Sequence, residues 1–129
     1  MIGLDTNVLV RYLAQDDPRQ AGRAAQAIES VTGGEILITS VVLCELVWVL
    51  EDAYEYERRE IASVLDTILR TAQFTFEHKD VLCRALEDYR QGKADFSDYV
   101  IGRLGRENGC EHTLTFDRAL KGHPLFRVL

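Results

Sequence analysis

Four acidic side chains stand at comparable places along the 129-residue sequence: Asp5, Glu45, Asp98 and Asp117. Two of them end strand-like runs, and two fall in the opening turns of predicted helices. Elements that start or end at the carboxyl edge of one parallel sheet bring such side chains together, and ligands bind at that edge. Carboxylates about 4 Å apart repel by about 4 kcal/mol at an effective dielectric of about 20. A fold tolerates them when a divalent cation supplies the opposite charge.

The chemistry that such a site performs is phosphodiester hydrolysis. Oxygen ligands without nearby Cys or His favour Mg²⁺ or Mn²⁺. Mg²⁺ keeps part of its water shell and bridges to substrate phosphates, and one or two ions would activate a water molecule and stabilise the leaving oxygen. We therefore expect the four acids to be both catalytic residues and metal ligands.

Each acid also has a simpler interpretation, because an acid or hydroxyl before a helix caps it by accepting backbone N–H groups. For Asp5, Asp98 and Asp117 taken singly, capping is favoured, and only the whole set reverses that judgement. Glu45 is different, because it lies in the apolar run from Val41 to Leu50, which predicts a largely buried helix. No Lys or Arg lies within helical reach of it, so Glu45 needs a partner, a metal ion or an aqueous cleft.

The composition is that of a soluble globular protein, 47% apolar and 28% charged, and the length fits one domain over residues 1–129. No apolar run approaches the roughly 20 residues that cross a bilayer, and the start carries no secretory signal. Three widely spaced cysteines without a C-x-x-C pair predict reduced thiols in the cytoplasm, and with the scattered histidines they argue against zinc. The net charge of −6 argues against binding a polyanion through bulk charge. It does not exclude a nucleic-acid enzyme whose acidic centre holds divalent cations.

Strands alternate with helices along the chain, which predicts an α/β fold with a mainly parallel central sheet covered on both faces. The expected strands lie at residues 2–4, 36–39, 74–76, 112–116 and 126–129. The expected helices lie near residues 8–13, 18–31, 41–54, 61–69, 78–91 and 97–108. Gly33-Gly34 is predicted to stop the second helix and Ser40 to cap the third. Arg19 and Arg23, four residues apart on the second helix, form a basic edge that either faces a polyanion or is simply solvated.

Four short motifs resemble those of PIN-domain nucleases when taken as an ordered set. They are L-D-T-N-V-L from Leu4, S-V-V-L-C-E-L around Glu45, D-Y-V-I-G from Asp98 and T-F-D ending at Asp117. The length and the N-terminal start resemble the VapC-type toxins of bacterial and archaeal toxin–antitoxin pairs. The resemblance covers nearly the whole chain.

This resemblance implies a PIN-like α/β/α sandwich and a Mg²⁺-dependent ribonuclease that is commonly dimeric and held inactive by an antitoxin. It assigns the four acids to the metal site, Thr6 and Asn7 to a polar pair in the first motif, and Thr115 to the threonine before the last acid. Two positions depart from the family pattern. Asp95 is an extra acid three residues before Asp98, and Gly102 stands where Ala is common. The first leaves open which acid is the third ligand, and the second is expected to be neutral.

We prefer Asp98 to Asp95 as the third ligand. Asp95 precedes the helix, where it can cap by accepting the N–H group of Ser97 or Asp98. Asp98 lies in the first turn on the same helical face as Ile101. Since Ile101 is expected to pack onto the sheet, Asp98 should point toward the sheet edge. Asp95 is then left to support the site.

Other functions fit the sequence less well. A non-catalytic RNA- or protein-binding module on the same fold remains as the alternative, although the presence of all four acids disfavours it. A phospho-acceptor receiver domain needs a Lys closing a late strand, whereas Lys121 lies past Asp117. A phosphatase with an aspartate nucleophile would need a second acid where Asn7 stands.

The partners expected are an RNA substrate, a cognate antitoxin protein and a second copy of the chain, with no membrane. The helices at 41–50 and 61–69 carry more apolar side chains than one small core would hide. Exposed apolar surface of that extent usually marks an interface.

Overall fold

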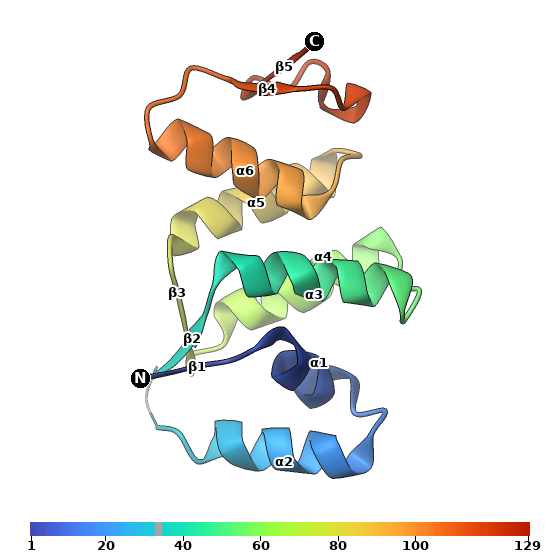
Figure 1. The fold of residues 1–129 in the computed structure, drawn as a ribbon, viewed down its shortest axis with the longest axis vertical. Coiled ribbons are helices and arrows are strands. Elements are labelled where there is room, and N and C mark those ends of the chain that lie inside the picture. The colour runs from blue at the N-terminus through green and yellow to red at the C-terminus, as the bar shows by residue number, and fades with distance from the viewer. Residues whose placement is uncertain (33–34) are drawn as a thin grey trace. The chain divides into compact units, whose positions relative to one another are not determined.

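The protein is described by a computed structural model that covers residues 1–32 and 35–129 (Figure 1). The chain divides into two compact units, Met1–Glu77 and His78–Leu129. Each unit contains a parallel sheet and the helices that connect its strands, so the predicted α/β fold with parallel strands is confirmed. Among the residues described, no helix combines the length and the apolar character needed to cross a membrane.

The first unit is built on a three-stranded parallel sheet in the order β1-β2-β3, formed by β1 (Ile2–Gly3), β2 (Ile36–Ile38) and β3 (Phe74–Phe76). The four α-helices described in this unit are α1 (Thr6–Ala14), α2 (Pro18–Glu29), α3 (Ser40–Asp52) and α4 (Arg58–Arg70). The central strand is buried, since Ile36 and Ile38 are both 0% exposed. The sheet was expected to be covered on both faces, yet its first strand is exposed, because it lies at the edge and pairs, among the described residues, with β2 alone.

Helix starts follow the cap chemistry of the sequence, with one correction. Asp17 caps α2 by accepting the Gln20 N–H, and Pro18 occupies the first turn, as predicted. The third helix is capped by Thr39, whose hydroxyl accepts the Val42 N–H at 3.3 Å, and not by Ser40. Ser40 instead donates its N–H and its hydroxyl to Glu77 Oε1. The predicted stop at Gly33-Gly34 lies outside the described residues.

Helix α4 does not expose the apolar surface that the sequence predicted for it. Five of its apolar side chains are buried, and Val64 is half-buried; the five are Ile61, Ala62, Leu65, Ile68 and Leu69. On α3, in contrast, Val41 is 65% and Trp48 is 45% exposed. These two residues are seven positions apart, so they share one face of the helix. Of the two apolar helices, only α3 therefore presents a surface suited to an interface.

The second unit consists of α5 (Lys79–Gln91), α6 (Phe96–Glu107), the short 3₁₀ helix η1 (Arg118–Leu120) and a parallel pair of strands, β4 (Thr113–Thr115) and β5 (Phe126–Val128). Helices α5 and α6 pack together, with the rings of Tyr89 and Phe96 edge to face at 6.0 Å. Figure 1 shows β4 following α6 and the chain ending at β5.

Gly102 of α6 is required by packing, so the expectation that it is neutral was wrong. A Cβ atom at this position would lie 2.5 Å from Cζ of Phe126 in β5. The absence of a side chain lets the Phe126 ring approach the helix backbone. The glycine therefore allows the last strand to pack closely against α6, which an alanine would obstruct.

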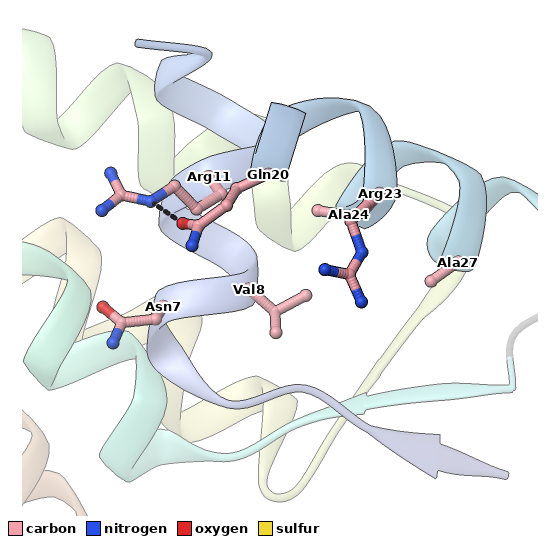
Figure 2. A pocket seen from close by; sticks show the side chains of 7 residues that line it. All are labelled: Asn7, Val8, Arg11, Gln20, Arg23, Ala24 and Ala27. Carbon is pink, nitrogen blue, oxygen red and sulfur yellow. Dashed lines mark hydrogen bonds between the residues drawn. The ribbon is translucent and has the colours of Figure 1, made fainter. Parts of the chain in front are cut away.

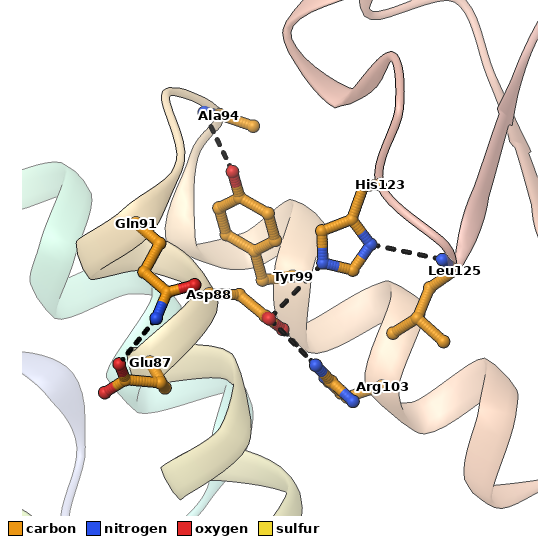
Figure 3. Close-up of polar contacts among 8 residues, drawn as sticks. All are labelled: Glu87, Asp88, Gln91, Ala94, Tyr99, Arg103, His123 and Leu125. Carbon is orange, nitrogen blue, oxygen red and sulfur yellow. Dashed lines mark hydrogen bonds and ion pairs between the residues drawn. The ribbon is translucent and has the colours of Figure 1, made fainter.

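The loop after η1 is fastened to both helices of its unit by Asp88 of α5 (Figure 3). Arg103 of α6 donates two hydrogen bonds to the Asp88 carboxylate, at 2.7 and 2.8 Å. Nε2 of His123 lies 3.3 Å from Asp88 Oδ1, and the other ring nitrogen accepts the Leu125 N–H at 3.1 Å. Since that nitrogen is an acceptor, Nε2 carries a proton and donates it to Asp88. This cluster fixes the segment between η1 and β5.

Burial alone would raise the pKa of the Asp88 carboxyl, but the hydrogen bonds from Arg103 and His123 and the charge of Arg103 hold this pKa below its usual value. A carboxyl whose pKa is lower in the folded than in the unfolded state stabilises the fold above its unfolded pKa. That stabilisation is lost as the pH falls from about 4 through the folded-state pKa.

We predict that Asp88→Asn lowers the free energy of unfolding by about 2 kcal/mol at pH 7, because Arg103 is left without its charged partner in a partly buried position. The difference in unfolding free energy between wild type and variant should become smaller as the pH is lowered below about 4, where Asp88 of the wild type takes up a proton. Urea unfolding at several pH values measures both effects. The neighbouring exposed acid serves as a control, and Glu87→Gln should stay within about 0.5 kcal/mol of wild type. A gap that does not change with pH would contradict the role given to Asp88.

Candidate active site

Asp5 stands where the sequence placed it, in the turn between β1 and α1. It is the N-cap residue of α1, and its Oδ1 accepts the Thr6 N–H at 2.9 Å. Its side chain is exposed. Capping therefore engages one carboxylate oxygen at the start of the helix.

Thr6 connects this turn to Glu45 of α3. The Thr6 side chain is buried, with 7% exposure, and its hydroxyl donates to Glu45 Oε1 at 2.8 Å. This hydrogen bond joins α1 to α3 through two residues that are 39 positions apart in the sequence. In the sequence Thr6 stands out only as a supporting polar residue, because no local pattern points to a partner so far along the chain.

Glu45 is exposed, so the expectation that it sits in a largely buried part of α3 was wrong. The buried face of α3 consists of Val42, Leu43, Leu46, Val47 and Leu50. Glu45 lies outside this face, and apolar neighbours in the sequence do not imply burial when a helix has one solvent side. The partner that the carboxylate was predicted to need is present, and it is the neutral Thr6 hydroxyl.

Cys44, next to Glu45, is a half-buried free thiol. Burial raises the pKa of its thiol to about 11. The thiolate is the reactive form of cysteine, and it is scarce at pH 7. The chemistry available here thus rests on the carboxylates.

Asp95 and Asp98 form a reciprocal cap at the start of α6. The Asp95 side chain accepts the Asp98 N–H, and Asp98 Oδ2 accepts the Asp95 N–H at 3.2 Å. The cap role predicted for Asp95 is confirmed. The argument that aimed Asp98 at the sheet was wrong, because Ile101 on the same face is 55% exposed. The face that α6 buries carries Phe96, Tyr99, Val100 and Gly102.

The pKa of Asp98 is raised above its usual value. Partial burial is the largest cause, the hydrogen bond from the Asp95 backbone opposes it, and the negative charges of Asp95 and Asp117 add to it. Asp98 therefore carries its charge in a place where other carboxylates disfavour it. A cation bound nearby would reverse this effect.

Asp117 follows β4 and caps η1, with its Oδ1 accepting the Ala119 N–H at 2.9 Å. Its own backbone N–H donates to Oγ1 of Thr115 at 3.0 Å. Thr115 thus holds the backbone from which the Asp117 side chain projects. The role expected for Thr115 in support of a metal site stays a prediction.

The structure thus brings the predicted acids together as two pairs. Asp5 and Glu45 are linked through Thr6 in the first unit, and Asp98 and Asp117 interact electrostatically in the second. Within either unit, no three Asp, Glu, His or Cys side chains of the described residues form a metal-binding group. The gathering of all four acids stays a prediction.

Asn7, the other polar residue of the first motif, is exposed and lines a pocket between α1 and α2 (Figure 2). The pocket has a volume of about 380 Å³. Its wall also contains Val8, Arg11, Gln20, Arg23, Ala24 and Ala27. Of these residues, only Asn7 and Arg23 stand out in the sequence, because the pattern of one helix does not reveal a pocket that it forms with a second helix.

Two comparisons with known proteins agree with this description. The family model of the PIN domain matches residues 2–123, a range that runs through both units. The VapC ribonuclease of Aquifex aeolicus (strain VF5) is 28% identical over 120 residues, which cover 92% of this chain and 88% of that protein. The resemblance drawn from the four motifs is confirmed.

Substitutions of the two acids in the reciprocal cap, Asp95 and Asp98, should change the thermal stability of the protein differently. Asp95→Ala should lower the free energy of unfolding by about 1 kcal/mol, the usual effect of removing an N-cap side chain. Asp98→Asn keeps an oxygen that can accept the Asp95 N–H and removes a repelled charge, so the melting temperature should not fall. Both variants are compared with wild type at pH 7 in EDTA. A loss of stability in Asp98→Asn as large as in Asp95→Ala would show that the Asp98 charge is structural.

Proposed function

Because the chain belongs to the PIN domain family, we propose that it is a Mg²⁺-dependent endoribonuclease, the toxin of a toxin–antitoxin pair, working as one domain over residues 1–129 in the cytoplasm. The observation that carries the proposal is the state of the four predicted acids. Each accepts one hydrogen bond through one oxygen, from Thr6 N, Thr6 Oγ1, Asp95 N or Ala119 N. The second oxygen of each carboxylate makes no such bond within the described residues and is left to bind a cation.

The donor set fits Mg²⁺ or Mn²⁺. Hard divalent cations prefer carboxylate oxygens. Partial burial is the largest cause of the raised pKa of Asp98, and the charges of Asp95 and Asp117, which add to it, are ones that a cation would offset. We assign the ligands as Asp5, Glu45, Asp98 and Asp117. When bound, the ion would supply a water molecule activated for attack on the phosphodiester and neutralise charge on the leaving oxygen.

The residues of the chain orient these ligands. Thr6 holds Glu45 beside the helix start that Asp5 caps, and the Asp95 N–H fixes the Asp98 carboxylate. Thr115 holds the backbone of Asp117. Such supporting contacts keep ligands in place, and removing them typically reduces metal affinity or activity about 10- to 100-fold.

We predict that the protein cleaves single-stranded RNA in Mg²⁺ or Mn²⁺ and that excess EDTA stops cleavage. Hydrolysis that displaces the 3′ oxygen should leave 5′-phosphate and 3′-hydroxyl ends. Asp5→Asn should reduce the rate by more than about 100-fold, and Thr6→Val by about 10- to 100-fold, the range of a residue that orients a ligand. Rates are measured on a labelled RNA by gel electrophoresis.

The control is Asp52→Asn, an exposed acid on α3 away from Thr6, which should cleave at the wild-type rate. Cleavage that persists in EDTA, or ends with a cyclic phosphate, would overturn the mechanism. RNA binding without any cleavage in either metal would favour the non-catalytic module instead.

We also propose that the protein forms a homodimer and is inhibited by an antitoxin segment lying in a groove that leads to the acids. The support for a dimer is the exposed apolar face of α3, with Val41 and Trp48. A basic antitoxin side chain would compete with the metal ion for the carboxylates.

Trp48→Ser should raise the dissociation constant of the dimer about tenfold or more, because exposed aromatic residues dominate interfaces. Trp48→Phe, which keeps an aromatic ring, is the control, and sedimentation velocity at micromolar concentration is the measurement.

Inhibition by the antitoxin should weaken as the Mn²⁺ concentration rises. A wild-type monomer that copurifies with no antitoxin from its own operon would contradict both proposals.

A further inference from the structure

The pocket between α1 and α2 has an apolar floor and a basic, amide-rich rim. Val8, Ala24 and Ala27 supply apolar surface, and the rim contains Arg11 and Arg23 with the amides of Asn7 and Gln20. None of the seven residues that line the pocket is acidic, although the whole chain has a net charge of −6. This local charge distribution favours an anionic occupant.

The two arginines of the pocket differ in whether they already have hydrogen-bond or ion-pair partners. Arg11 is already engaged, since Nη1 lies 3.2 Å from Asp16 Oδ1 and Nε donates to Gln20 Oε1 at 2.7 Å. Arg23 makes no hydrogen bond or ion pair with any residue in the ranges 1–32 and 35–129. Figure 2 shows its guanidinium extending from α2 to the side of Val8. Arg23 is thus the cation of this pocket that remains available to a ligand.

The Gln20 amide is oriented as a donor. Because its oxygen accepts the Arg11 Nε–H, its nitrogen points away from Arg11 (Figure 2). With the Arg23 guanidinium, this gives planar hydrogen-bond donors above a small apolar floor. Unpaired bases of RNA are recognised by stacking on aromatic or guanidinium planes and by hydrogen bonds to their edges. This pocket offers a guanidinium and amide donors beside an apolar surface on which a base can pack.

We propose that this pocket binds one unpaired nucleotide of the RNA substrate, with its base on the Val8 and Ala27 floor and Arg23 at its phosphate. The proposal rests on the proposed ribonuclease function. The volume of about 380 Å³ lies within the range of small-molecule sites, which begins near 300 Å³. Asn7 and Val8 fall in the first turn of α1, which Asp5 caps, so the bound nucleotide would lie next to a proposed metal ligand.

This position favours RNA over a protein segment as the occupant. A substrate strand that reaches Asp5 must pass the first turn of α1, where the pocket opens. A single free cation above an apolar floor matches the alternation of phosphate and base in single-stranded RNA.

The test compares two pocket variants with a matched control, all in the full-length Asp5→Asn protein in EDTA so that RNA stays intact. Ala27→Leu fills the floor without changing charge, and Arg23→Gln removes the free cation. Arg19→Gln removes a charge one turn away on the same helix, at an exposed residue that does not line the pocket. The probes are fluorescein-labelled uridine and adenosine octamers and an abasic ribose-phosphate octamer, and fluorescence anisotropy gives the dissociation constants.

Ala27→Leu should weaken binding of a base-containing octamer about tenfold, because the larger side chain keeps the base off the floor, and should leave the abasic octamer unchanged. Arg23→Gln should weaken base-containing and abasic octamers alike, by about tenfold, and Arg19→Gln by no more than about twofold. If Arg19→Gln and Arg23→Gln weaken RNA binding equally, the loss of affinity reflects only the lower positive charge of α2, and the proposal is overturned. Wild-type affinity in Ala27→Leu would overturn it as well, as would a failure of the parent protein to bind any octamer.

The test can also show that the pocket binds the antitoxin and not RNA. If both pocket variants bind RNA normally but no longer bind the antitoxin, the pocket belongs to the protein partner and the proposal fails. Cleavage by the wild-type protein in Mg²⁺ is measured separately. If the wild-type protein does not cleave RNA but the pocket variants lose base-dependent binding as expected, only the proposed enzyme activity is overturned. If the wild-type protein cleaves RNA but the pocket variants bind the octamers like their parent, only the nucleotide site is overturned.

Discussion

The repulsion between carboxylates is the constraint on which the proposed site depends. The fold controls these charges by placing each acid at a hydrogen-bond donor: Asp5, Asp98 and Asp117 at backbone N–H groups near helix starts, and Glu45 at the Thr6 hydroxyl. A helix start favours negative charge. Each donor engages one oxygen and leaves the other without a hydrogen bond among the described residues. Capping and metal binding, which compete as interpretations of the sequence, are therefore compatible in the structure.

Much of the fold followed from the sequence because it is set by local patterns. Asp17-Pro18 starts α2, and the apolar, β-branched run at Ile36–Ile38 is the buried central strand. Parallel pairing follows from the alternation of strands with helices. Thr39 replaced Ser40 as the cap of α3 because Ser40 bonds to Glu77, 37 positions away. Such a contact depends on the register between β2 and β3, which no local pattern contains.

The site was predictable in its residue types and less so in its geometry. Periodicity identifies one face of a helix but not what covers that face. Glu45 was therefore expected to lie among buried neighbours, and Ile101 was expected to pack against the sheet, yet both are exposed. The long-range hydrogen bond from Thr6 to Glu45 and the packing of Phe126 on Gly102 have no signal in one sequence either.

An acidic centre that cleaves RNA must attract the polyanion that its own carboxylates repel. With 21 acids against 15 bases, the chain as a whole does not supply that attraction. A bound cation lowers the charge at the acids, but binding along the strand needs positive groups beside them. The ion pair with Asp16 offsets the charge of Arg11, and the Nε–H of Arg11 orients the Gln20 amide, whereas Arg23 keeps its charge at the edge of the same pocket. The division of roles between these arginines leaves Arg23 as the available cation of the pocket, where it can hold a phosphate without neutralising the carboxylates that we propose as metal ligands.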